Sequence, residues 1–339
     1  MKSIKVEDAI GTVLCHDITQ IIPGKFKGIA FKKGHIILAE DIRVLLSLGK
    51  DNIYVWENEK GTLHENEAAE RLKNLTAGEG LIFSSIKEGK IDFIAEEDGL
   101  LKVDKEALVK LNSLDEIMLA TMHNNTPVKK GQKVAGTRVI PLVIQEEKIQ
   151  MAENLIKGTI IQILPILGKK LGIVTTGNEV YQGRIKDSFG SVVIKKAKEY
   201  GCEVLGQTIL PDDLNRITDA INEWISIGAE MVICTGGMSV DPDDVTPTAI
   251  KNTGSQLITY GSPVLPGAMF LLAYYGAIPI LGLPGCVMYS KRTVFDLVFP
   301  RILAGERLNK HDIAVYGHGG LCMDCIECRF PNCSFGKGD

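Results

Sequence analysis

Residues 167–306 predict an α/β fold, a three-layer αβα domain with a parallel sheet, preceded by smaller α+β and β-rich modules. Short apolar strands such as LGIVTT at 171–176 alternate there with segments that have helical periodicity. Strands that alternate with crossover helices are typical of a parallel sheet covered on both faces. In such sheets ligands bind at the carboxyl ends of the strands, so we look for the functional residues in the loops that follow the strands.

The elements of this domain are expected in a regular order. Strand 171–176 leads to a helix over 188–200, and strand 202–210 leads to a helix that Asp212 caps and Gly228 ends. In that second helix Leu214, Ile217 and Ile221 lie on one face. The remaining elements are a strand over 229–237, a helix over 245–252, a strand over 278–284 and a long final helix from Cys286.

The rest of the chain divides into three further regions. Residues 1–57 end in a short helix that stops at Gly49 and a strand through Val55. Residues 58–166 mix strand-like runs with short helices and predict an α+β module. Residues 307–339 form a cysteine-rich tail.

Composition excludes several function classes. The chain has 339 residues and a formal net charge of −4, which gives no electrostatic reason to bind nucleic acid or an anionic membrane surface. The first ten residues lack the apolar core of a secretory signal. Residues 262–290 carry no charge, but repeated Pro and Gly break the run, which favours sheet strands over a membrane helix. We therefore expect a cytoplasmic protein.

Three loops that follow strands contain the residue types that hold a phosphate. Glycines let backbone N–H groups approach an anion, the helix that follows each loop favours negative charge, and Thr and Ser hydroxyls can donate to phosphate oxygens. The carboxylates of Glu179, Asp187 and Asp244 could hold Mg²⁺ against such a phosphate. One Gly-Gly turn alone does not indicate a binding site, but three such loops at one edge of a sheet do. The expected ligand contacts are Thr175, Thr176, Gly177, Asn178, Glu179, Thr235, Gly236, Gly237, Ser239, Pro284 and Gly285.

These motifs resemble those of a known family. TTGNEV, the DS of GRIKDSFG, GCEV, VICTGGMSVDPDDVTPTAI, LPGAM and GLPGC follow one another as in the molybdopterin-binding domain of the MoeA/MogA family, over about 135 residues. The segment AIGTVLCHDIT is similar to the start of MoeA proteins, and FKKGHIILAEDIRVLLSLGKDNIYVWE is similar to the stretch that precedes their cofactor-binding domain. The resemblance implies that molybdopterin, free or adenylylated, binds across the three loops.

The resemblance also implies an activity and partners. Asp244 matches the reactive centre of the family, and Asp187 would position the metal there. The implied reaction is molybdenum insertion, with molybdate as the second substrate and Mg²⁺ as the cation. Implied partners are molybdoenzymes or other proteins of cofactor biosynthesis, and the implied assembly is a homo-oligomer.

Departures from the family pattern keep two alternatives open. A Lys-Pro-Gly-Lys-Pro-like element is replaced by VLPGA, so that Leu265 and Ala268 stand where two lysines are usual. Loss of two cations removes an attraction for molybdate and favours a non-catalytic molybdopterin carrier or chaperone. The run Asp243-Asp244-Val245-Thr246 is also similar to CinA-type proteins, which act on nucleotide pyrophosphates. The retained Asp244 favours catalysis.

The cysteines fall into two groups. Cys15, Cys202 and Cys234 are isolated in or beside apolar runs and are expected to be small buried side chains. The tail instead contains the spacing C-x₂-C-x₂-C-x₄-C, which is typical of metal centres. A [4Fe–4S] cluster and a Zn²⁺ ion both remain open as its occupant. The expected ligands are Cys322, Cys325, Cys328 and Cys333.

Overall fold

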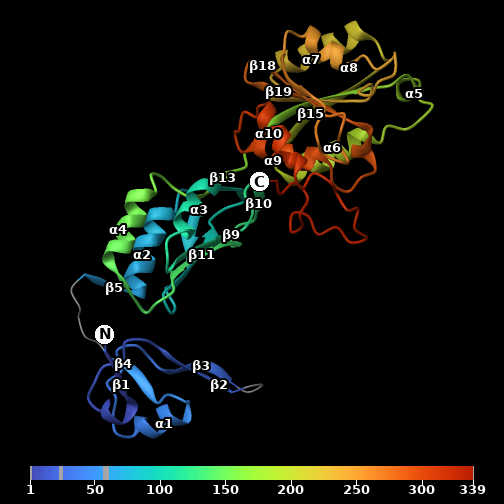
Figure 1. Cartoon of the computed structure of the whole chain (residues 1–339). Helices are drawn as coiled ribbons and strands as arrows, with labels where there is room; N and C mark the ends of the chain where they lie inside the picture. Colours follow the sequence, from blue (N-terminus) through green and yellow to red (C-terminus); the bar gives the residue numbers. More distant parts are fainter. Residues whose placement is uncertain (1, 23–25, 56–60, 339) are drawn as a thin grey trace. The chain divides into compact units, whose positions relative to one another are not determined.

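The computed structural model describes residues 2–22, 26–55 and 61–338 and divides the chain into two compact units. The first comprises residues 1–96, 103–122 and 131–162, and the second comprises residues 97–102, 123–130 and 163–339. Figure 1 shows the elements of both units along the chain. None of the helices in the described ranges is long and apolar enough to cross a membrane.

The first unit begins with a small module built around its own apolar core. Val6, Leu14, Ile37 and Leu45 are at most 1 % exposed in this core. As predicted, a short helix precedes a strand through Val55, and β4 pairs with β1 in antiparallel register. The elements are β1 (Lys2–Lys5), β2 (Ile18–Ile22), β3 (Phe26–Phe31), α1 (Asp41–Ser47) and β4 (Asn52–Val55).

The middle of the chain mixes helices with short antiparallel sheets, as the alternation of its sequence predicts. Its largest sheet has the order β6-β7-β11-β9. Phe93 of β7 is fully buried, and burial along β7 alternates as expected for a strand with one covered face. The elements are β5 (Thr62–His64), α2 (Glu65–Thr76), β6 (Leu81–Phe83), β7 (Lys90–Ala95), β8 (Gly99–Val103), α3 (Lys105–Asn112), β9 (Ile117–Thr121), β10 (Thr126–Val128), β11 (Lys133–Val139), β12 (Val143–Gln145), α4 (Glu146–Leu155) and β13 (Ile161–Pro165).

The second unit is built on a six-stranded sheet of order β15-β14-β16-β19-β18-β17. Strands β15, β14, β16 and β19 run parallel, which confirms the predicted fold class. Strand β18 runs antiparallel to both β19 and β17. The turn between β18 and β19 contains Gly276, whose φ of +58° lies in the left-handed region that glycine favours. The strands are β14 (Lys170–Thr176), β15 (Glu203–Leu210), β16 (Met231–Thr235), β17 (Gln256–Tyr260), β18 (Leu271–Tyr275) and β19 (Ile278–Leu283).

Helices cover both faces of this sheet, which gives the predicted three layers (Figure 1). Successive residues of β14 pack into different apolar clusters, because alternate side chains of a strand point to opposite faces. Ile173 packs with α6 (Phe189–Glu199) and α9 (Val294–Leu303), whereas Val174 packs with α7 (Leu214–Ser226) and α8 (Thr246–Asn252). A parallel strand buried on both faces explains why LGIVTT is continuously apolar up to its two threonines.

Two predicted helix starts are wrong. Asp213, not Asp212, caps α7, because its carboxylate accepts a hydrogen bond from the Arg216 N–H at 2.9 Å. No long helix begins at Cys286: residues Gly285–Met288 form a 3₁₀ turn (η2), and α9 starts only after Thr293. Thr293 has Asp296 three positions later, and the two form a capping box that fixes the start there.

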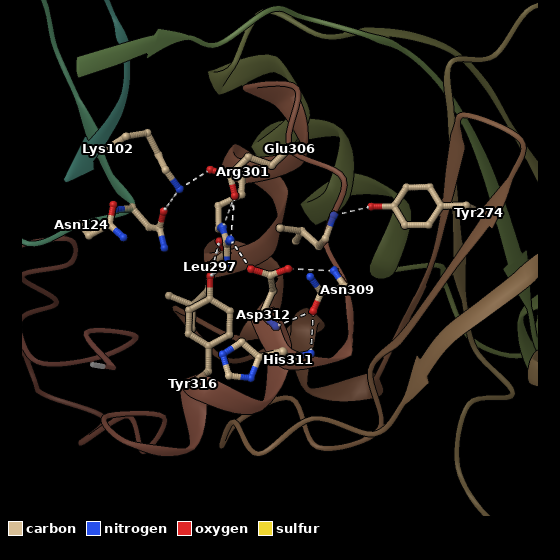
Figure 2. A network of polar contacts seen from close by, with 12 residues as sticks. Lys102, Asn124, Tyr274, Leu297, Arg301, Glu306, Asn309, His311, Asp312 and Tyr316 are labelled. Atoms are coloured by element: carbon tan, nitrogen blue, oxygen red, sulfur yellow. Dashed lines mark hydrogen bonds and ion pairs between the residues drawn. The ribbon is translucent and has the colours of Figure 1, made fainter. Parts of the chain in front are cut away.

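The tail of the chain packs into the second unit. It contains α10 (Lys310–Ala314) and a 3₁₀ turn, η3 (Val315–Gly317), and Tyr316 and Phe335 are each 3 % exposed among the core residues of the sheet. Figure 2 shows the polar network at its root, centred on Arg301 of α9. The Arg301 guanidinium is paired with Glu306 at 2.7 Å and Asp312 at 2.9 Å and donates to the Tyr316 hydroxyl at 3.2 Å.

Candidate functional site

The three predicted loops leave the sheet at one edge. Thr175 at the end of β14 lies opposite Thr235 at the end of β16, and Thr235 lies opposite Leu283 at the end of β19. On the other side, Thr176 lies opposite Leu210 at the end of β15. Parallel strands therefore bring four loops together at their carboxyl ends, where open α/β sheets bind ligands.

Buried hydroxyl groups form the floor of this edge. Thr175 and Thr235 are fully buried, and the Thr235 hydroxyl donates to the Thr175 hydroxyl at 3.1 Å. The amide of Gln207 on β15 donates both to the Thr175 hydroxyl at 2.8 Å and to the Asp187 carboxylate at 2.6 Å. These threonines therefore support the loops from below. Gln207 was not predicted, because a polar side chain inside an apolar strand gives no signal of its partner.

Asp187 fixes the start of helix α6. Its carboxylate accepts hydrogen bonds from the Phe189 N–H at 2.8 Å and the Gly190 N–H at 3.1 Å. With Gln207 on the same carboxylate, both oxygens are engaged within the protein. Its predicted catalytic role stays a prediction, and its contacts assign it to holding α6 against β15.

The second loop approaches the first through its glycines. Gly236 and Gly237 have φ angles of +87° and +54°, and a Cβ atom on Gly236 would overlap the carbonyl oxygen of Thr176. The Thr176 and Thr246 hydroxyls are 3.2 Å apart beneath this contact. Met238 then turns inward over Gly282 of β19, where a Cβ atom would meet its Sδ at 2.8 Å. Only glycine allows these close approaches.

Asp212 belongs to the site, although the sequence suggested only a helix cap. Asn178 of the first loop donates its N–H to the Asp212 carboxylate at 3.0 Å, and the Asp212 N–H returns a bond to the Asn178 side chain at 3.4 Å. Burial raises the pKa of Asp212, and the negative charges of Glu179 and Asp243 raise it further. The missed signal was its position two residues after β15, at the same edge as the other loops.

Tyr260 of β17 holds the second loop through hydrogen bonds to its backbone. Its hydroxyl lies 2.9 Å from the Met238 carbonyl oxygen and 3.0 Å from the Ser239 carbonyl oxygen, so it can donate to either. Burial raises the pKa of this hydroxyl, and the nearby Asp244 raises it further, which keeps the proton on the donor. Asp244 itself accepts a hydrogen bond from the Asp241 N–H at 2.9 Å. Sequence analysis missed Tyr260 because β17 was not predicted.

The third loop contains Pro284 and Gly285 at the start of η2. The helices that follow the other two loops are short: α5 spans Asn178–Tyr181 and α8 spans seven residues. Aligned peptide dipoles are few in such helices, so any anion must be held mainly by loop N–H groups and hydroxyls. Ser239 and Gly285 are exposed at this edge, where a ligand can reach them.

Acidic side chains dominate the rim. Glu179, Asp212, Asp243 and Asp244 all come from the loops at this edge. Within the described ranges, no group of three or more His, Cys, Asp or Glu side chains is placed to hold a metal ion. The predicted metal centre of Cys322, Cys325, Cys328 and Cys333 is therefore not supported by the positions of these side chains. The three isolated cysteines, Cys15, Cys202 and Cys234, are buried as predicted. Burial raises the pKa of the Cys234 thiol to about 12.

The sheet order, the strand-end loops and the close glycine contacts define an α/β domain whose candidate site lies at the carboxyl edge, where such sheets bind ligands. Residues 172–304 match the family model described as "Probable molybdopterin binding domain". For these residues the match confirms the resemblance to the molybdopterin-binding domain of the MoeA/MogA superfamily that the motifs predicted. Residues 3–57 match a domain of unknown function, DUF8806.

Relatives in several lines of the superfamily match parts of the chain. A molybdopterin molybdenumtransferase of Synechococcus elongatus is 26 % identical over 164 residues, which are 44 % of this chain and 41 % of that protein. A CinA-like protein of Thermosipho melanesiensis is 36 % identical over 91 residues, 26 % of this chain and 22 % of that protein. The solved structure of the molybdopterin biosynthesis enzyme MoaB from Thermus thermophilus shows 20 % identity and a TM-score of 0.34, over 41 % of this chain and 98 % of that one. The chain thus spans less than half the length of these two curated relatives.

Proposed function

We propose that the carboxyl edge of the sheet binds the phosphate end of molybdopterin, free or adenylylated, in a step of molybdenum-cofactor biosynthesis. The observation that carries this proposal is the convergence of three loops at one edge of the sheet. There Gly236 lies so close to Thr176 that a Cβ atom on it would overlap the Thr176 carbonyl oxygen. That contact leaves no room for a side chain on Gly236 between the first two loops. Backbone N–H groups of glycine-rich loops bind phosphate in many folds.

A divalent cation fits the acidic rim. A phosphate ester approaching Glu179, Asp243 and Asp244 meets negative charge, and burial together with the charges of Glu179 and Asp243 raises the pKa of Asp212 beside them. Mg²⁺ is commonly held by one or two carboxylates together with substrate phosphates. We assign Asp244 and Glu179 to this cation, which when bound would offset the charge of the phosphate and of molybdate. Asp187 positions the floor of the site through Gln207.

Molybdenum insertion is the proposed reaction, and a non-catalytic carrier is the second candidate. A specific observation favours the carrier: Leu265 and Ala268 occupy the positions of the family lysines, and the backbone of Leu265 is bonded to the tail at Gly320 and Cys322. Asp244 favours the enzyme, because its carboxylate is on the rim rather than engaged in the core. Nothing in the site favours a CinA-like pyrophosphate hydrolase over these two.

Release of AMP distinguishes the enzyme from the carrier. With adenylylated molybdopterin and molybdate, the wild-type chain is expected to release AMP, and Asp244→Asn is expected to slow release about a hundredfold, because one charge that holds the cation is lost. Asp241→Asn is the matched control, since it removes the same charge from the same loop but keeps the Asp241 N–H bond to Asp244. It should retain the wild-type rate. Binding without any AMP release by the wild type would contradict the enzyme and support the carrier.

A further inference from the structure

Two exposed thiols of the tail lie three residues apart on the wall of one cavity. Cys325 and Cys328 are both free and exposed, and both line a cavity in the second unit whose wall also includes Pro266 and residues 289–292. Neither thiol belongs to the site at the carboxyl edge of the sheet. Two sulfurs that share a cavity can react with each other even where no third ligand is placed to complete a metal centre.

The backbone bends between these two cysteines. The residues that separate them, Ile326 and Glu327, form a bend, and the Ile326 side chain is fully exposed. The Lys291 ammonium donates to the carbonyls of Cys325 and Ile326 at 3.0 and 2.9 Å and holds the backbone at the start of the bend. A bend shortens the distance between the residues on its two sides, so a disulfide across it requires little movement of the backbone.

The outer two cysteines of the tail are held by the rest of the domain. The Leu265 N–H donates to the Gly320 carbonyl, and the Cys322 N–H donates to the Leu265 carbonyl, both at 2.8 Å. Cys322 and Cys333 are half-buried and pack against the apolar core of the sheet. The two inner cysteines are therefore the thiols that a substrate can reach.

A cation lies beside one thiol of the inner pair. The Arg292 guanidinium interacts with the Cys328 side chain and lies 5.0 Å from the centre of the Phe330 ring. The carboxylate of Asp296, which is 6 % exposed, accepts a hydrogen bond from Arg292 at 2.8 Å and so fixes its position. Reactive cysteines are found in such exposed, electropositive surroundings, which makes Cys328 the attacking thiol of the pair.

We propose that Cys325 and Cys328 form a redox pair that reduces an organic disulfide. The Cys328 thiolate attacks one sulfur of the substrate, whose S–S bond breaks and releases one thiolate. The Cys325 thiolate then attacks the Cys328 sulfur of the mixed disulfide, forms the Cys325–Cys328 bond and releases the second thiolate. Two electrons pass from the pair to the substrate, and the two protons of the cysteine thiols end on the two released thiols. The pair belongs to the C-x₂-C class that exchanges in this way, and none of its residues lies in the three loops of the pterin site.

Reaction of the full chain with oxidised glutathione under anaerobic conditions tests the proposal. After an acid quench, free thiols are alkylated and tryptic peptides are sequenced by mass spectrometry. Cys322, Cys325 and Cys328 share the peptide of residues 311–329, whereas Cys333 lies on the next one. The reduced wild type is expected to carry an alkyl group on all three cysteines of the first peptide. The oxidised wild type is expected to carry one on Cys322 alone, with a bond between Cys325 and Cys328.

Single variants test the order of the two steps. Cys325→Ser lacks the second thiol, so it should stop at the mixed disulfide and retain glutathione on Cys328. Cys328→Ser lacks the attacking thiol and should react about tenfold more slowly. Cys286→Ser is the control: it removes a half-buried thiol of the neighbouring η2 turn and should close the disulfide like the wild type. Circular dichroism should be the same for all variants.

Three outcomes would overturn the proposal. The oxidised wild type could form no bond between Cys325 and Cys328, or it could join Cys325 to Cys322 instead. In the third, Cys328→Ser would react with oxidised glutathione as fast as Cys325→Ser, which would remove the assigned role of Cys328.

Discussion

A Gly236→Ala variant is expected to lose molybdopterin binding by at least about a hundredfold, equivalent to about 2.7 kcal/mol of binding free energy. The added Cβ would overlap the Thr176 carbonyl oxygen, so the second loop must move away from the first. The backbone N–H groups that we assign to the phosphate would then no longer face one position. Titration calorimetry of wild type and variant measures the change directly.

Gly254→Ala is the matched control for this variant. Gly254 has a φ of +86°, almost the same as the +87° of Gly236, but nothing lies within 4 Å of the position of its Cβ. Both variants incur the same left-handed strain of about 1 kcal/mol, and only one incurs the clash. Gly254→Ala should therefore bind molybdopterin like the wild type. Equal affinities for all three proteins would contradict the assignment of the glycine loop to the site.

An Arg301→Ala variant is expected to destabilise the second unit by about 3–5 kcal/mol. The Arg301 side chain is 5 % exposed and compensates both Glu306 and Asp312. Its removal leaves Asp312 without its cation, Glu306 with Lys102 alone, and the Tyr316 hydroxyl without one of its partners (Figure 2). Differential scanning calorimetry should show a lower unfolding temperature for this unit.

Arg71→Ala provides the contrast. Arg71 also bonds two carboxylates, those of Glu146 and Glu153, but its side chain is 29 % exposed and water can replace the lost pairs. A loss of about 1 kcal/mol or less is expected, confined to the first unit. If the two variants shifted their unfolding transitions equally, burial would not be the factor that makes the Arg301 network important.

The parallel core of the domain could be predicted because each strand is a short apolar run between glycines or polar turns. The antiparallel strand β18 could not, since the uncharged residues 262–290 show no period that marks where one strand ends and the next begins. Asp212 and Asp213 illustrate the limit at the site: either aspartate can cap the helix, and only the structure shows that Asp213 does so. Partners such as Gln207 and Tyr260 come from other strands, which local sequence does not reveal.

The tail shows the limit of a sequence motif. The spacing of its four cysteines predicted a metal centre, because cysteines that share a metal are often close in sequence, but no three of them are placed to hold a metal ion. The tail is held instead by backbone bonds between Leu265 and residues more than fifty positions later. No periodicity or motif predicts such pairs, and so the position of the tail beside Leu265 had to come from the structure.

Amide hydrogen exchange of the full chain with and without molybdopterin tests the central claim most directly. Bound molybdopterin is expected to slow exchange in three separate segments at once, residues 175–179, 235–239 and 284–286, and to leave exchange unchanged along the opposite edge of the sheet. Protection of one segment alone, or of none of the three while molybdopterin is bound, would contradict a pterin-phosphate site at the carboxyl edge.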